Sequence, residues 1–164
     1  MTIRPLAPGD REAVHRILVR RRVFNEKEIP VALEVLDAFF EKGEESGYEA
    51  YGCFSGTDLA GYVCFGAIPM TDSRYDLYWI AVDEKRGGQG VGASLLRFVE
   101  EAVRKQGGGK IYVETSSTDP YGPARAFYGK QGYAVVSILR DFYRPGDDKV
   151  VFLKDVAAAE TFRG

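Results

Sequence analysis

Residues 76–99 read DLYWIAVDEKRGGQGVGASLLRFV, and most of what the chain can do follows from this segment. Its first seven residues, 76–82, are rich in aromatic and branched side chains and predict a buried strand. From Val91 onward apolar residues recur at helical spacing, which predicts an amphipathic helix. The connection between them contains Gly87, Gly88, Gly90 and Gly92. Such a turn leaves backbone N–H groups at the positive end of the helix dipole, so we expect a phosphate or diphosphate ligand there.

The glycine spacing narrows the choice of ligand. A P-loop requires Gly-Lys followed by Ser or Thr, and the chain has no such triplet. A dinucleotide-binding fingerprint counted from Gly88 and Gly90 places Ala93 where a third glycine is usual, so that match is weak. About half the chain also precedes the loop, whereas the fingerprint usually follows the first strand of its unit.

Two motifs resemble signatures of the GNAT superfamily of N-acetyltransferases. Residues 87–92, GGQGVG, resemble its acyl-CoA diphosphate loop, Arg/Gln-x-x-Gly-x-Gly/Ala, but Gly87 occupies the first position and Arg86 stands one residue early. Residues 124–133, ARAFYGKQGY, resemble the second signature, an aromatic pair in a helix followed by glycine and an aromatic residue that opens a strand. The order of the two motifs and their separation suit a βαβ unit, so together they are more specific than either alone.

The resemblance implies a mixed α/β fold with a twisted, mostly antiparallel sheet of about seven strands and about four helices. The sheet is expected to splay between the Asp76 strand and the Lys110 strand, forming a V-shaped cleft for acetyl-CoA as co-substrate. A single domain over 1–156 and a tail over 157–164 are expected. The residues that the resemblance assigns to the cofactor are Ile80, Ala81, Val82, Arg86, Gly87, Gly88, Gln89, Gly90, Val91, Gly92, Ala93, Tyr121, Ala124 and Phe127.

Acetyl transfer to an amine requires a neutral amine, a donor for the oxyanion and a proton for the departing thiolate. Tyr128 occupies the position of the family's general acid, and a phenol with an ordinary pKa near 10 stays protonated at neutral pH. Asp76 and Glu114 are the candidate bases, and each has an alternative role as an ion-pair or capping group. Many members of the superfamily have no dedicated base. Tyr121 stands where the family often has an asparagine, and its ring is expected to stack on the pantetheine arm or to pack.

The composition argues against several other classes of protein. With 164 residues, 45% hydrophobic and 28% charged, the chain suits one globular domain. A net charge of −2 gives no reason to expect a nucleic-acid partner, and no apolar run is long enough to span a membrane, so a cytoplasmic protein is expected. One histidine and two cysteines support no metal site. Cys53 and Cys64 are expected to be free thiols, opposite Ala60 and Glu49 in a hairpin.

Periodicity and turn residues predict the remaining elements. They are a strand over 2–5, helices over 10–21 and 31–42, a hairpin over 48–55 and 59–67, a strand over 110–115, a helix over 120–131, and strands over 133–139 and 149–154 joined by a turn at 144–148. The second helix is expected to bury Val31, Val35, Leu36, Phe39 and Phe40.

The resemblance implies an enzyme that acetylates a primary amine of a small molecule or peptide, and dimers are common among such domains. Asp72, Asp76 and Glu114 suggest a cationic acceptor. Two alternatives stay open, a non-catalytic acyl-CoA-binding or regulatory module and a Rossmann-like nucleotide-binding protein.

Overall fold

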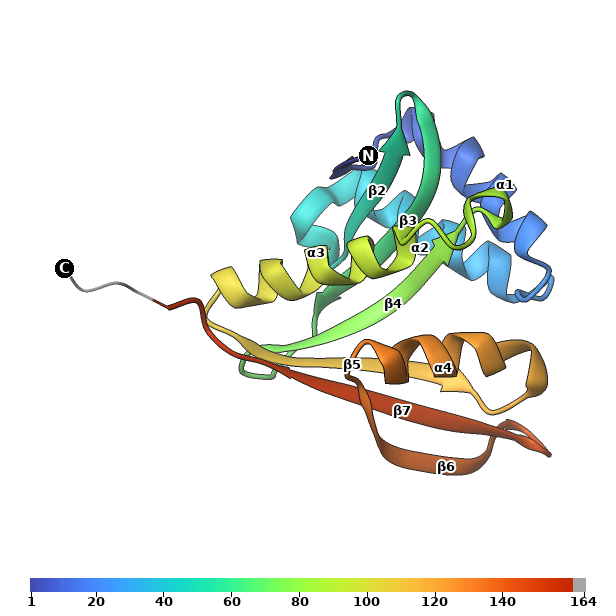
Figure 1. Cartoon of the computed structure of the whole chain (residues 1–164), viewed down its shortest axis with the longest axis vertical. Helices are drawn as coiled ribbons and strands as arrows, with labels where there is room; N and C mark the ends of the chain where they lie inside the picture. Colours follow the sequence, from blue (N-terminus) through green and yellow to red (C-terminus); the bar gives the residue numbers. More distant parts are fainter. Residues whose placement is uncertain (161–164) are drawn as a thin grey trace. The chain divides into compact units, whose positions relative to one another are not determined.

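The computed structural model describes residues 1–160, which form seven strands and four α-helices (Figure 1). The helices are α1 (Arg11–Arg21), α2 (Glu28–Lys42), α3 (Val91–Lys105) and α4 (Gly122–Lys130). Short 3-10 turns occur at Pro8–Asp10, Gly43–Ser46, Glu84–Arg86 and Asp119–Tyr121. The strands are β1 (Thr2–Pro5), β2 (Glu49–Ser55), β3 (Asp58–Ala67), β4 (Arg74–Val82), β5 (Gly109–Ser116), β6 (Ala134–Arg144) and β7 (Asp147–Val156).

The strands form one sheet in the order β1-β2-β3-β4-β5-β7-β6, which confirms the predicted mixed α/β fold class. The pairs β1–β2, β2–β3, β5–β7 and β6–β7 are antiparallel, whereas β4 and β5 are parallel. The β4–β5 ladder runs only from Arg74 and Lys110 to Leu77 and Val113, and both strands continue beyond it. The chain forms two compact units, Met1–Ala67 with Tyr78–Val99 and Ile68–Leu77 with the chain from Glu100 onward. A single domain over 1–156 stays a prediction.

The core of the first unit lies where α1 and α2 pack against β2 and β3, and Ile17, Leu36 and Tyr62 are each at most 2% exposed there. Helix α2 begins three residues before the predicted Val31, because Pro30 sits in the first turn, where a backbone N–H would have no helical partner. The predicted apolar face of this helix is only partly right. Ala32, Leu33 and Leu36 are buried, whereas Val31 is 47% exposed.

The β2–β3 hairpin differs by one residue from the predicted register. Cys53 pairs with Gly61 and Cys64 with Ala50, because a bulge between Cys53 and Phe54 inserts one extra residue into the ladder. Both cysteines are buried free thiols, as predicted.

In the second unit, α4 covers one face of the β5–β7 pair. Tyr128 of α4 packs on Phe152 of β7 and on Tyr133, with ring centroids 5.5 and 6.0 Å apart. Strand β6 extends to Arg144, five residues beyond the predicted end, and all eleven of its residues are exposed. The predicted tail over 157–164 lies partly outside the described residues. Within residues 157–160, the N–H of Ala159 donates to the Arg104 carbonyl at 3.2 Å.

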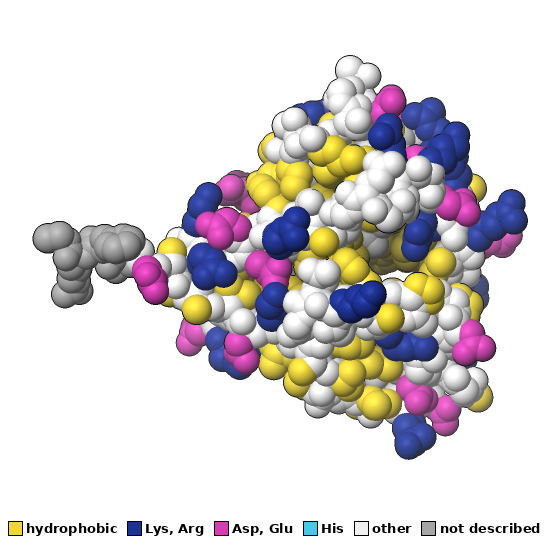
Figure 2. Space-filling view, in the orientation of Figure 1, with side chains coloured by type: hydrophobic (Ala, Val, Ile, Leu, Met, Phe, Trp, Pro, Cys, Tyr) yellow, Lys and Arg dark blue, Asp and Glu magenta, His cyan; other side chains and the backbone are white. Residues whose placement is uncertain are grey.

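Residues 1–160 contain neither a membrane-spanning helix nor a cluster of metal-binding side chains. None of the helices in residues 1–160 has the length and apolar character needed to cross a membrane. Nor do three or more His, Cys, Asp or Glu side chains within that range gather in a way that could hold a metal ion. Figure 2 shows Lys and Arg side chains interspersed with Asp and Glu on the visible face, without a large area of one sign.

Candidate active site

The glycine loop of the first unit has the backbone conformation that its sequence predicts. The carboxylate of Asp83 accepts the Lys85 N–H at 3.1 Å and so caps the 3-10 turn that leads into the loop. Gly88 and Gly90 then adopt φ values of +77° and +74°, in the left-handed region that favours glycine. Helix α3 starts at Val91, and Ser94 donates to the Gly90 carbonyl at 3.0 Å.

The loop presents a row of available donors. Within residues 1–160, the backbone N–H groups of residues 88–93 donate to no other group of the chain. They surround the first turn of α3, where the helix dipole adds positive potential. A Cβ built on Gly88 or Gly90 would meet nothing within 4 Å, so the space beside this backbone is open. Successive amides of this kind are a site for a phosphate or diphosphate.

Neighbouring elements of the first unit hold this loop in place. Arg20, near the end of α1, forms an ion pair with Asp83 at 3.5 Å. Arg86, which the resemblance assigns to the cofactor, forms an ion pair with Asp58 at the start of β3, at 3.8 Å. Gly61 of β3, which no sequence motif marks, is closely packed, because a Cβ there would approach both the Ala81 carbonyl and a Val91 methyl to 2.9 Å. The absence of a side chain at Gly61 lets α3 begin directly against the sheet.

The end of β4 contains Ile80, Ala81 and Val82, which the resemblance assigns to cofactor binding. Ala81 is buried, whereas Ile80 and Val82 are half-buried. The β4–β5 ladder stops at Leu77, so it does not include these residues. Their predicted contact with pantetheine stays a prediction.

Tyr128 lies in the second unit, in an aromatic cluster beneath α4. Its side chain is 6% exposed, and burial raises the pKa of its phenol well above the usual 10. Phe127, the residue directly before Tyr128, is half-buried. Tyr121, directly before α4, and Ala124 are also half-buried.

The two candidate bases lie together on the face of the sheet opposite α4. Asp76 of β4 pairs with Tyr112, and Glu114 lies two residues further along β5 on the same face. Lys149 of β7 is 3.0 Å from Glu114. Partial burial is the main cause that raises the pKa of Asp76, the charge of Glu114 raises it further, and Lys149 opposes both. Acid and base candidates therefore lie on opposite faces of the β5–β7 pair.

Comparison with known proteins identifies the class. The sequence model of the Acetyltransferase (GNAT) family matches residues 11–133. A crystal structure of a GNAT-family protein from Desulfovibrio desulfuricans is similar to the chain with a TM-score of 0.91 and 38% identity, covering 95% of this chain and 99% of that one. A search of curated protein sequences finds no significant match.

Two more distant structures share the fold. The ribosomal-protein-S18-alanine N-acetyltransferase of Escherichia coli has a TM-score of 0.75 at 22% identity, with 97% of this chain and 96% of that chain covered. A PaiA N-acetyltransferase from Thermoplasma acidophilum in complex with coenzyme A has a TM-score of 0.73 at 17% identity, with 94% and 98% covered.

The chain belongs to the GNAT family of acetyltransferases, because the family match covers most of its length. This confirms the resemblance drawn from the two motifs, and the chain is an enzyme of the N-acetyltransferase class.

Proposed function

We propose that the chain transfers the acetyl group of acetyl-CoA to a primary amine of a small molecule or peptide. The amine nitrogen attacks the thioester carbonyl, forming an N–C bond, and the C–S bond breaks to release the coenzyme A thiolate. The thiolate takes a proton from Tyr128, and the surplus proton on nitrogen passes to a carboxylate or to water. The observation that carries the proposal is the row of available amides over residues 88–93, which suits the diphosphate of coenzyme A.

Two other features support this chemistry. Burial raises the pKa of Tyr128, so its phenol keeps its proton at alkaline as well as neutral pH. Asp76 and Glu114 lie on the opposite face of the sheet. Asp76, whose pKa is raised by partial burial, can take up the surplus proton of the amine. The proposed cofactor contacts of Tyr121, Ala124 and Phe127 belong to the same hypothesis.

A binding and a release assay test this function. Isothermal titration with acetyl-CoA, NAD and ATP is expected to show micromolar or tighter binding for acetyl-CoA alone. Release of free coenzyme A, followed with a thiol reagent over a panel of amines, amino acids, polyamines, aminoglycosides and peptides, is expected to identify the acceptor. Binding of acetyl-CoA without turnover of any acceptor would favour the non-catalytic module, and preferential binding of NAD or ATP would contradict the proposal.

Replacing Gly90 by alanine tests the loop itself. An L-residue at a φ of +74° is strained by about 1–2 kcal/mol, so the Kd for acetyl-CoA is expected to rise about 5- to 30-fold. Gly87→Ala is the matched control, because Gly87 has an ordinary φ of −57° and a Cβ there would make only a normal contact of 3.5 Å with the Glu84 carbonyl. Equal Kd values for both variants, measured by titration, would contradict the role of the loop conformation.

The predicted homodimer also stays a proposal, and β6 is its candidate surface. This strand forms an edge of the sheet and exposes six large apolar residues, namely Val135, Val136, Ile138, Leu139, Phe142 and Tyr143. A long apolar edge strand is a template for pairing with another strand. Arg140 and Asp141 are consecutive on it, so antiparallel pairing with a second copy can bring opposite charges together. The cytoplasmic location likewise stays a prediction.

Ile138→Lys is expected to convert a dimer into a monomer, because a charge would replace a 55% exposed apolar side chain in the interface. Val31→Lys on α2 changes an apolar residue of similar exposure outside β6 and is expected to leave the assembly unchanged. Light scattering coupled to size exclusion measures both masses. A monomeric unaltered protein, or a dimer that survives Ile138→Lys, would contradict this interface.

A further inference from the structure

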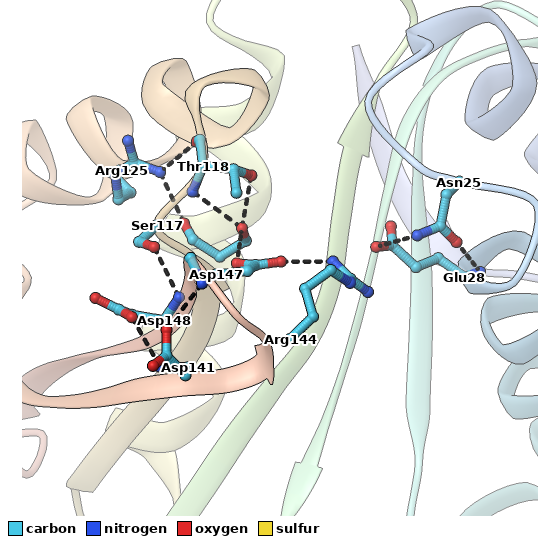
Figure 3. Close-up of polar contacts among 11 residues, drawn as sticks. Asn25, Glu28, Ser117, Thr118, Arg125, Asp141, Arg144, Asp147 and Asp148 are labelled. Atoms are coloured by element: carbon cyan, nitrogen blue, oxygen red, sulfur yellow. Dashed lines mark hydrogen bonds and ion pairs between the residues drawn. The ribbon is translucent and has the colours of Figure 1, made fainter.

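A polar network that the proposed reaction does not use joins two segments, the β5–α4 connection and the β6–β7 turn (Figure 3). Its centre is the carboxylate of Asp147, whose side chain is only 5% exposed. One carboxylate oxygen accepts the Ser116 hydroxyl at 2.5 Å, and the other lies 2.6 Å from Nη1 of Arg144. A buried carboxylate is stable only when it is paired in this way, so the position of Asp147 determines where Arg144 is held.

Further hydrogen bonds make this support rigid. Arg125 of α4 donates to the carbonyls of Ser116 and Thr118 at 2.7 and 2.8 Å. The N–H of Asp148 donates to the Ser117 hydroxyl at 2.8 Å, and the Ser117 N–H donates to the Asp148 carbonyl at 3.0 Å. The β5–α4 connection is thus bonded to the start of β7 through both Asp147 and Asp148.

Arg144 itself is the exposed member of this network. Its side chain is 60% exposed, although Nη1 is held by the buried carboxylate. An arginine that is fixed through one nitrogen and accessible elsewhere loses little side-chain freedom when it binds a ligand. The planar guanidinium matches the geometry of a carboxylate. The arrangement is therefore suited to receiving an anion from solution.

The network lies on the same face of the sheet as the candidate bases. Glu114 and Ser116 are two residues apart on β5, so both side chains lie on the face opposite α4. Ser116 pairs with Lys149 in the β5–β7 ladder. Asp76 pairs with Tyr112, four residues before Ser116, which corresponds to about 13 Å along the strand. One face thus carries Asp76 at one end, the Glu114–Lys149 ion pair in the middle and an anchored guanidinium at the other end.

We propose that Arg144 binds an anionic group of the acceptor, so that the acceptor is a primary amine carrying a carboxylate several bonds away. The proposal rests on the proposed acetyl transfer and specifies its substrate class. An α-amine beside its own carboxylate is too short to reach both ends of the face. An ω-amino acid or a short peptide with a free C-terminus separates its two charged groups further, and both present the same carboxylate.

Matched acceptors test this inference through kcat/KM. The series is 6-aminohexanoate, 6-aminohexanamide and hexylamine, with triglycine and its C-terminal amide as the peptide pair. The unaltered enzyme is expected to prefer each carboxylate over its amide by about 10- to 100-fold, the range for hydrogen bonds to a charged group. Arg144→Met is expected to abolish this preference, mainly through KM, while the amides react as before.

Two further variants test whether the preference depends on the guanidinium group of Arg144 in particular. Arg144→Lys keeps the charge but not the planar fork and is expected to retain part of the preference. Arg104→Met removes another exposed arginine that is paired with an acidic residue three positions away, Glu101, and is expected to keep the full preference. An unaltered enzyme without any carboxylate preference, or equal losses with acid and amide acceptors in Arg144→Met, would overturn the inference.

A measurement independent of turnover distinguishes this inference from the acetyl transfer itself. In an NMR titration with 6-acetamidohexanoate, the side-chain Nε–H signal of Arg144 is expected to shift, and 6-acetamidohexanamide is expected to leave it unchanged. That result in a protein that fails to bind acetyl-CoA would reject the proposed function but keep the carboxylate site. Acetyl transfer with no shift of the Arg144 signal would reject the carboxylate site alone.

Discussion

Replacing Tyr128 by phenylalanine is expected to lower kcat by about 100-fold or more while leaving the Kd for acetyl-CoA unchanged. The substitution removes only the hydroxyl, and the ring keeps its contact with Phe152 at 5.5 Å. Because burial raises the pKa of Tyr128, the phenol stays protonated under alkaline assay conditions and donates a hydrogen bond to the departing sulfur. A thiol has an ordinary pKa near 8.5, lower than that of the phenol, so transfer of the proton to sulfur is uphill and the hydrogen bond supplies most of the stabilisation.

Tyr133→Phe provides a matched control for this prediction. Tyr133 belongs to the same aromatic cluster, and its buried hydroxyl has no hydrogen-bond partner in the part of the chain that the structure describes. Removing that hydroxyl is expected to leave kcat unchanged and to maintain or raise the melting temperature, since an unsatisfied buried group costs stability. For both variants, single-turnover kinetics measures the rate, calorimetric titration measures the Kd for acetyl-CoA, and thermal unfolding measures the melting temperature. Normal turnover of Tyr128→Phe would show that the thiolate obtains its proton elsewhere.

Replacing Asp76 by asparagine is expected to lower kcat/KM by about 100-fold at neutral pH and to remove the acidic limb of the pH–rate profile. In the unaltered enzyme the base works only as a carboxylate, so activity is expected to rise with pH through the raised pKa of Asp76. Glu114→Gln removes one cause of that shift and frees Lys149, which lowers the pKa of Asp76. The acidic limb of this variant is therefore expected to move to lower pH with activity retained at pH 8. The opposite pattern in the two variants would assign the base to Glu114.

Thermal unfolding of Asp76→Asn gives a second, independent readout. The folded-state pKa of Asp76 lies above its unfolded value, so its favourable contribution to stability is present below the unfolded pKa of about 3.9 and is lost as pH rises through the folded pKa. At pH 7 the ionised side chain is therefore a cost. We expect Asp76→Asn to unfold at an equal or higher temperature than the unaltered protein at pH 7, although its activity is lower.

Several elements could be predicted because their causes are local. The strand, glycine turn and helix over 74–105 follow from spacing alone, and the buried stripe of α1 at Val14, Ile17 and Leu18 follows from helical periodicity. The errors occurred where packing decides. The bulge at Cys53 shifted the hairpin register, and α2 buries Leu33 in place of Val31 because contact with the sheet sets its rotation.

The features of the candidate site are likewise of two kinds, those set by neighbouring residues in the sequence and those set by tertiary packing. Gly88 and Gly90 require no partner to favour a left-handed backbone, so the sequence by itself determined that a loop of available amides precedes α3. Only the tertiary structure decided which carboxyl group has a raised pKa and which arginine is held by a buried carboxylate. The pKa of Asp76 depends on burial and on Glu114, which lies 38 positions later in the chain, and Arg144 is held because Asp147 is buried against Ser116, 31 residues away. Electrostatic interactions and burial depend on distances in space, whereas backbone conformation depends on the residues next to one another.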